Sequence, residues 1–370
     1  MRKSIAIIIT SILVLSGCNK QQSVSDRLLN EVEKAIAINP DSASNLLKSI
    51  SSPEKLDNKT FARWCMLSGK ITDEIFNSIL PTYQLERAYD WYSSHGSPDE
   101  QVQILIYLGR SYFADGDYDK AMSIYTNALD IAEKNKLNNL TGYTYSYIGD
   151  LYGEKFMRTE AIKRYKAAAE CFKKENNTDS YACALRDVGR EYACIDSLSR
   201  ALKILTIADS VARNTKNIEV TASIDNALGN IYAMQNKYDK AEEYFLKALV
   251  GRETMPDYMA LIDLYIASGA INKAQELLSK ILQDNPKYTY SIKYLYYQIY
   301  NEEKNYKEAL TNLKEYVEIT DSIIYADNQS KILNIESKYN HLKISKEVDR
   351  LKIKQQSYII VLVICIGILL

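Results

Sequence analysis

Apolar residues along most of this chain recur at the three- and four-residue steps of amphipathic helices and rarely alternate strictly with polar ones, as they would in strands. Helix-breaking residues are also sparse, because 370 residues contain only 13 glycines and 6 prolines. Both features predict a mostly helical protein of the all-α class. Two apolar runs, residues 5–15 and 359–370, stand apart from this pattern.

One pattern of small and apolar residues occurs four times, in residues 108–129, 148–169, 188–209 and 228–249. Each copy has a glycine, a tyrosine three residues later and an alanine twelve residues after the glycine. The glycines lie 40 residues apart and are Gly109, Gly149, Gly189 and Gly229. Small residues let neighbouring helices approach closely, and no single copy can bury its apolar face alone. Stacked copies are therefore expected to form the core.

This spacing resembles the tetratricopeptide repeat, in which Gly and Tyr mark the first helix of a pair and Ala, an aromatic residue and Ala mark the second. The resemblance implies a superhelical solenoid of antiparallel helix pairs. Its spine would consist of the four glycines packed against the first alanine of each second helix, namely Ala121, Ala161, Ala201 and Ala241. A period of 40 residues is longer than usual, which predicts either helices extended by a turn or longer connections.

The array is predicted to span residues 26–320. Its best repeats are residues 102–135, 142–175, 182–215 and 222–254, and degenerate units occupy residues 26–93, 255–289 and 290–320. Within the first degenerate stretch, residues 39–50 are typical of the second helix of a pair, and residues 61–93 of one further, irregular pair.

The N-terminus has the features of a targeting segment. Basic residues precede the apolar run 5–15, which leads into Leu15-Ser16-Gly17-Cys18. This motif resembles the bacterial lipobox, which implies a signal peptide at residues 1–17, a lipidated Cys18 and a linker at residues 18–25. The alternative is an ordinary secretory signal with an incidental cysteine. Both interpretations predict an exported protein.

The C-terminal part is predicted to be one long helix at residues 321–356 that leads into a transmembrane segment at residues 357–370. Ile332, Ile335, Tyr339 and Leu342 form a seam that favours a short coiled coil, although a solvated helix capping the solenoid explains the seam equally well. Twelve apolar residues rise only about 18 Å in a helix, against a hydrocarbon core of about 30 Å. We therefore expect the membrane segment to be cut short here and the natural chain to continue.

Charge and motif content exclude several classes of function. Acidic and basic residues nearly balance, at 47 and 46, so nucleic acid contacts are not expected. The two histidines lie in no metal-binding or nucleophilic pattern, and phosphate loops and hydrolase motifs are missing. We expect no enzyme, cofactor or metal. Among Cys171, Cys183 and Cys194, one pair would be able to form a disulfide in an oxidising compartment, or all three are small buried residues.

Tetratricopeptide repeats line a concave groove with their first helices, at positions three before and one after the glycine. These positions hold Ile106 and Arg110, Ser146 and Asp150, Arg186 and Arg190, and Asn226 and Asn230. Arginine forks and asparagine amides suit the backbone or carboxylate of an extended peptide. The candidate partner-binding residues are therefore Arg110, Asp150, Arg186, Arg190, Asn226 and Asn230. The alternative is that they only form a hydrated inner surface.

The order of parts resembles that of envelope tetratricopeptide proteins in which a periplasmic repeat domain precedes one transmembrane helix and often a LuxR-type helix-turn-helix. This resemblance implies a protein of the cell envelope, held by the Cys18 lipid, the C-terminal helix or both, with its repeats in the periplasm. It implies a protein or peptide ligand and a role as the sensory part of a transmembrane regulator. The alternative is a passive scaffold or assembly lipoprotein without signalling output.

Overall fold

The computed structural model describes residues 24–75, 79–284 and 289–326, together with residues 329, 350, 354, 357 and 358. Within these residues all regular structure is helical and no strand occurs. The expected all-α class is therefore confirmed for the described part of the chain.

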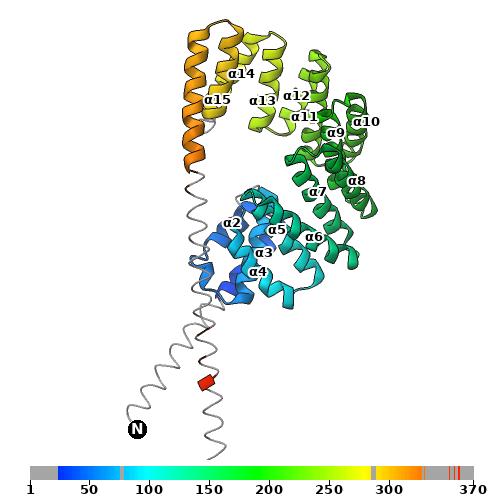
Figure 1. The fold of residues 1–370 in the computed structure, drawn as a ribbon, viewed down its shortest axis with the longest axis vertical. Coiled ribbons are helices and arrows are strands. Elements are labelled where there is room, and N and C mark those ends of the chain that lie inside the picture. The colour runs from blue at the N-terminus through cyan, green and yellow to red at the C-terminus, as the bar shows by residue number, and fades with distance from the viewer. Residues whose placement is uncertain are drawn as a thin grey trace, which may run out of the picture.

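Successive helices form antiparallel pairs along a curved path (Figure 1). The first three pairs are residues 24–36 with α2 (Pro40–Lys48), α3 (Asn58–Ile75) with α4 (Thr82–His95), and α5 (Pro98–Ala114) with α6 (Tyr118–Lys134); the short helix η1 (Pro53–Lys55) precedes α3. Next come α7 (Asn138–Glu154) with α8 (Arg158–Lys174), α9 (Thr178–Cys194) with α10 (Leu198–Ala212), and α11 (Ile218–Met234) with α12 (Tyr238–Gly251). The last pairs are α13 (Met255–Ala267) with α14 (Ile271–Asp284), and α15 (Thr289–Glu302) with residues 306–326. In Figure 1, α7 and α9 lie on the inner side of the arc, and α8 and α10 on its outer side.

Longer helices, not longer connections, account for the 40-residue period. Helices α5 to α9 have 17 residues each, and the connections between them have three. The middle residue of each connection is left-handed, with φ of 58° at Phe156 and 56° at Lys136. The third residue then donates its N–H to a carbonyl five residues earlier, as from Met157 to Tyr152 at 2.8 Å. This is the hydrogen bond that closes a helix C-terminus before the chain reverses.

The repeat glycines contact a different residue from the one expected. A Cβ atom built on Gly149 would lie 2.7 Å from Cε1 of Tyr165, and the other three glycines face Tyr125, Leu205 and Phe245 in the same way. The expected contact of Gly149 with Ala161 is therefore corrected, because the nearest side chain belongs to the large residue one turn later. That side chain is long enough to reach across the helix pair into the space that a missing Cβ leaves.

Several predicted features fall outside the described residues. These are the signal peptide at residues 1–17, Cys18, the seam from Ile332 to Leu342 and the apolar run 359–370. Among the helices that the structure does describe, none combines the length and apolar character required to span a membrane. The described cysteines, Cys65, Cys171, Cys183 and Cys194, are all free thiols. Cys171 and Cys183 are only partly buried and Cys194 is exposed, so the expectation that all three are buried is wrong.

Candidate functional site

Two adjoining hollows are lined by the first helices of successive pairs. The α7–α9 hollow has a volume of about 500 Å³ and is lined by residues that include Asp150, Glu154, Phe156 and Asp187. The α9–α11 hollow has a volume of about 460 Å³, and residues that include Asn226, Asn230, Met234, Arg252 and Asp257 line it. Arg186 and Arg190 border both hollows. The two hollows thus adjoin at α9, and we call the surface that they form over α7, α9, α11 and the start of α13 the groove.

Five of the six predicted partner-binding residues lie in this groove. Asp150 belongs to the α7–α9 hollow, Asn226 and Asn230 to the α9–α11 hollow, and both arginines to the shared border. Spacing from the repeat glycine therefore placed side chains from three different helices on one surface.

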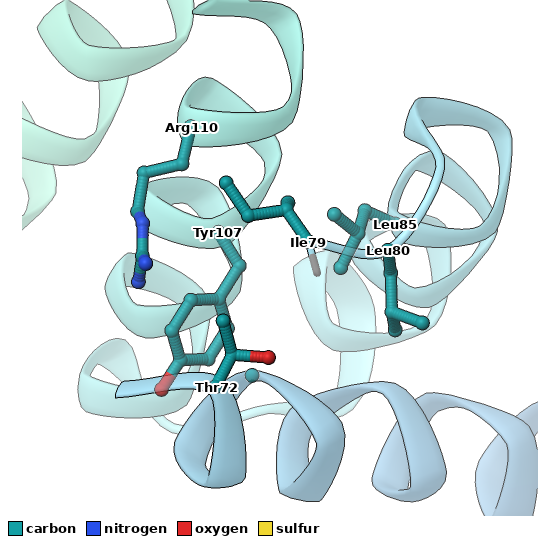
Figure 2. A pocket seen from close by; sticks show the side chains of 7 residues that line it. Thr72, Ile79, Leu80, Leu85, Tyr107 and Arg110 are labelled. Carbon is teal, nitrogen blue, oxygen red and sulfur yellow. The ribbon is translucent and has the colours of Figure 1, made fainter. Parts of the chain in front are cut away.

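Arg110 is the exception and is part of a separate contact between α3 and α5. Its guanidinium forms an ion pair with Asp73, which also accepts a hydrogen bond from the Tyr107 hydroxyl at 2.9 Å. Figure 2 shows Arg110 and Tyr107 on one helix, with Thr72 of α3 beside them, around a cavity of about 10 Å³. Arg110 therefore joins two repeats and is not part of the groove.

Arg186 is also bonded within the protein, although the sequence made it a candidate partner-binding residue. Its Nε donates to Asp187 Oδ1 at 3.0 Å, its Nη2 donates to Oδ2 at 3.1 Å, and its Nη1 donates to Ser223 Oγ at 2.9 Å. Burial alone would lower the pKa of Arg186, but the neighbouring Asp187 raises it above the ordinary value. The side chain thus links α9 to α11, and little of its hydrogen-bonding capacity is left for a ligand.

Asn226 has the equivalent linking role in the next repeat. Its Nδ2 donates to Oδ1 of Asp257 at 2.9 Å, and Asp257 is fully buried. Arg252 donates to both oxygens of Asp257, from Nε and Nη2, at 3.0 Å each. A buried carboxylate needs such pairing, because an unpaired buried charge is costly. These contacts fix α11 against the beginning of α13.

Three predicted residues remain accessible: Asp150, Arg190 and Asn230 are all exposed. Asp150 Oδ1 accepts a hydrogen bond from the Tyr165 hydroxyl at 2.7 Å. Desolvation by the surrounding protein raises the pKa of the Asp150 carboxyl to about 6, although Tyr165 acts against this change. Asn230 Nδ2 donates to Asn226 Oδ1 at 2.9 Å, and Asn230 lines the α9–α11 hollow.

Sequence reasoning missed the residues that pair with these side chains. Ser223, Arg252 and Asp257 border the groove, yet none occupies a position that the repeat pattern marks. Arg252 lies in a connection, and Asp257 in the first turn of α13. Only the packing of neighbouring repeats brings these residues to the groove, and a single sequence does not show that packing.

Family models agree with this geometry. Two tetratricopeptide repeat models match, one at residues 100–174 and the other at residues 221–255. The chain contains tetratricopeptide repeats. These segments cover most of α5, all of α6 to α8, most of α11 and all of α12, so the repeats that the models match contribute α7 and α11 to the groove.

Solved structures support the same architecture. A Rap protein complexed with Competence and Sporulation Factor has a TM-score of 0.62 at 18% identity, covering 82% of this chain and 88% of its own. NprR in complex with its cognate peptide NprX has a TM-score of 0.51 at 17% identity, covering 82% and 94%. A tetratricopeptide repeat protein from Parabacteroides merdae has a TM-score of 0.50 at 16% identity, covering 70% and 93%. At these identities the likeness shows the fold alone. No curated protein matches the sequence significantly.

Proposed function

We propose that this chain is a membrane-anchored, periplasm-facing tetratricopeptide module that binds a protein or peptide ligand and forms the sensory part of a transmembrane regulator. The observation that carries the binding function is the register of the exposed groove residues. Asp150, Arg190 and Asn230 occupy the same position on three consecutive first helices and face one groove. Arg186 and Asn226, which lie one turn before Arg190 and Asn230, bond each repeat to the next.

This arrangement suits an extended peptide. Such a peptide presents a backbone donor or acceptor every 3.3 Å or so, and arginine and asparagine side chains bind these groups and carboxylates. Exposed Met234 adds an apolar contact on the floor of the α9–α11 hollow. A Rap protein and NprR, which share the fold, have been solved with Competence and Sporulation Factor and with a cognate peptide, respectively.

The location rests on sequence features outside the described residues. A signal peptide at residues 1–17 would export the repeats, and the Cys18 lipid, the apolar run 359–370 or both would hold them at the membrane. The test is to compare wild-type protein with Cys18→Ser for incorporation of a labelled fatty acid and for partition into the membrane fraction. Failure of the wild-type protein to incorporate the label would exclude the lipid anchor.

Peptide binding is tested with a random dodecapeptide library presented to the purified protein, followed by titration of the selected peptides in solution. Arg190→Glu should weaken binding at least tenfold, because it reverses the charge at the centre of the groove. Lys203→Glu is the matched control: Lys203 is exposed on α10, the second helix of the same repeat, and undergoes the same charge reversal. Equal affinities for both variants would show that the groove is not the binding site.

A further inference from the structure

Two kinds of side chain line the groove. Some bond one repeat to the next, and others are exposed and available to a ligand. On α9 and α11 the residue three positions before the glycine, Arg186 or Asn226, bonds to the following repeat. The residue one position after the glycine is exposed, and on α7, α9 and α11 it is Asp150, Arg190 and Asn230. A ligand lying along the groove therefore meets an acid, a base and an amide, in that order.

Asp150 is an acid without an ion-pair partner among the described residues. Its only hydrogen-bond donor there is the Tyr165 hydroxyl, and Arg186 and Arg190 act on its carboxyl only at longer range, where they lower its pKa. Three further acids line the same hollow. Asp187 binds Arg186, and Glu191 binds Arg158 at 3.2 Å. Glu154 accepts a hydrogen bond from the Tyr118 hydroxyl at 3.5 Å. A carboxylate in a partly desolvated recess gains most from a cationic ligand group.

Phe156 lies on the rim of the same hollow and is 79% exposed. Its left-handed backbone closes α7, as the middle residue does in the neighbouring connections. Its ring already has a cationic neighbour, because Cζ of Arg158 lies 5.0 Å from the ring centroid. The binding of a ligand cation at Asp150 therefore does not depend on this ring.

Arg190 has the opposite character. Its side chain is 65% exposed, and its nearest carboxylate, Asp187 Oδ1, lies 3.8 Å away. Asp187 is already bonded at 3.0 Å to Arg186, so it neutralises Arg190 only weakly. The guanidinium fork therefore remains available to an anion.

Asp150 and Arg190 line the same hollow from two helices that are joined mainly through α8 and make few direct contacts with each other. A ligand that bridges α7 and α9 can therefore contact both side chains at once. We propose that the groove selects an extended peptide that carries a cationic and an anionic group, the cation binding at Asp150 and the anion at Arg190. This inference rests on the proposed peptide-binding function.

The test uses an array of dodecapeptides, acetylated and amidated, in which one Lys and one Glu are moved independently through a neutral background of Ala, Asn and Leu. Because the two binding residues are fixed in place, peptides with one particular separation of Lys and Glu should bind at least fivefold more tightly than peptides of identical composition with other separations. A second array with free termini distinguishes the sources of charge. If a terminal ammonium or carboxylate is the natural group, it will replace the Lys or the Glu.

Two variants assign each charge to its residue. Asp150→Asn should abolish the preference for Lys but keep the preference for Glu, and it retains an acceptor for the Tyr165 hydroxyl. Arg190→Gln should have the reverse effect, and Lys203→Gln should change neither preference. Circular dichroism of each variant confirms that it is folded.

The outcomes separate this inference from the function on which it rests. If peptides bind and Arg190→Glu weakens them, but charge spacing has no effect or Asp150→Asn keeps the Lys preference, the inference is overturned and the proposed function stands. If no peptide binds in either array or from the random library, both are overturned.

Discussion

Replacing Gly149 by alanine tests the contact that the repeat spine depends on. The added Cβ would lie 2.7 Å from Cε1 and 2.9 Å from Cδ1 of Tyr165, whereas an ordinary contact is 3.4 Å or more. The ring cannot easily move away, because Tyr165 is only 5% exposed and its hydroxyl donates to Asp150 at 2.7 Å. Relief of the clash would therefore strain both the core and the groove.

Two opposing effects set the magnitude. Alanine is favoured over glycine in a helix interior by about 1 kcal/mol. Overpacking of a well-packed site costs about 1–3 kcal/mol, and the pinned ring of Tyr165 places this site toward the upper end. We expect Gly149→Ala to lower the free energy of unfolding by about 1–2 kcal/mol.

Gly153 provides a matched control one turn later on the same helix. A Cβ atom there would have Glu191 Oε1 as its nearest neighbour, at 3.4 Å, which is an ordinary contact. Gly153→Ala should therefore raise the free energy of unfolding, by up to about 1 kcal/mol. Urea unfolding followed by circular dichroism measures both changes, provided that the slope with denaturant stays constant. A stabilised Gly149→Ala variant would refute the reasoning, because helix propensity would then outweigh the contact.

Three further predictions concern two arginines, one buried carboxyl and two cysteines. Arg186→Met should lower the free energy of unfolding by about 1–3 kcal/mol, because it leaves Asp187 with only the more distant Arg190 as a cationic partner. Arg190→Met should change the free energy of unfolding by no more than about 0.5 kcal/mol, and urea unfolding measures both. Burial raises the pKa of the Asp225 carboxyl to about 6, so the folded state binds a proton there more tightly than the unfolded state does. The stability of the wild-type protein should therefore rise relative to that of Asp225→Asn as the pH falls from 7 to 4.5. A difference that does not depend on pH would contradict this expectation. Cys194 is exposed, whereas Cys65 is fully buried and burial raises its thiol pKa, so maleimide should label Cys194 at least tenfold faster under native conditions.

The repeat pattern predicts the helical class and the helix pairs because small and large residues recur at a fixed spacing. It does not predict which residue of the second helix meets the glycine. That choice depends on how the helices cross, and the structure selects Tyr165 over Ala161. The pattern also does not predict the residues with a left-handed backbone, since glycine is the usual residue there and the chain has lysine and phenylalanine at positions 136 and 156.

Counting three positions before and one after each repeat glycine identifies the groove-facing side of each first helix. It does not show which of these side chains are available to a ligand. Arg186 and Arg190 are indistinguishable in the sequence, as two arginines one turn apart. In the structure one is held by Asp187 and Ser223 and the other is exposed. The difference arises from a residue of the next repeat, so it depends on a contact 37 residues away in the chain.

The separation of holding and exposed residues has a consequence for binding. The side chains that join α9 to α11 and α11 to α13 are already bonded before any ligand arrives, so the groove is ordered in advance. A ligand that contacts only Asp150, Arg190 and Asn230 breaks none of these bonds and avoids the cost of reorganising the repeats. A ligand that required Arg186 would have to remove it from Asp187, whose only other cationic partner among the described residues is Arg190. If the groove binds a ligand as proposed, the preference is carried by the residues that follow the glycines, and a change in their charge alters it without weakening the contacts between repeats.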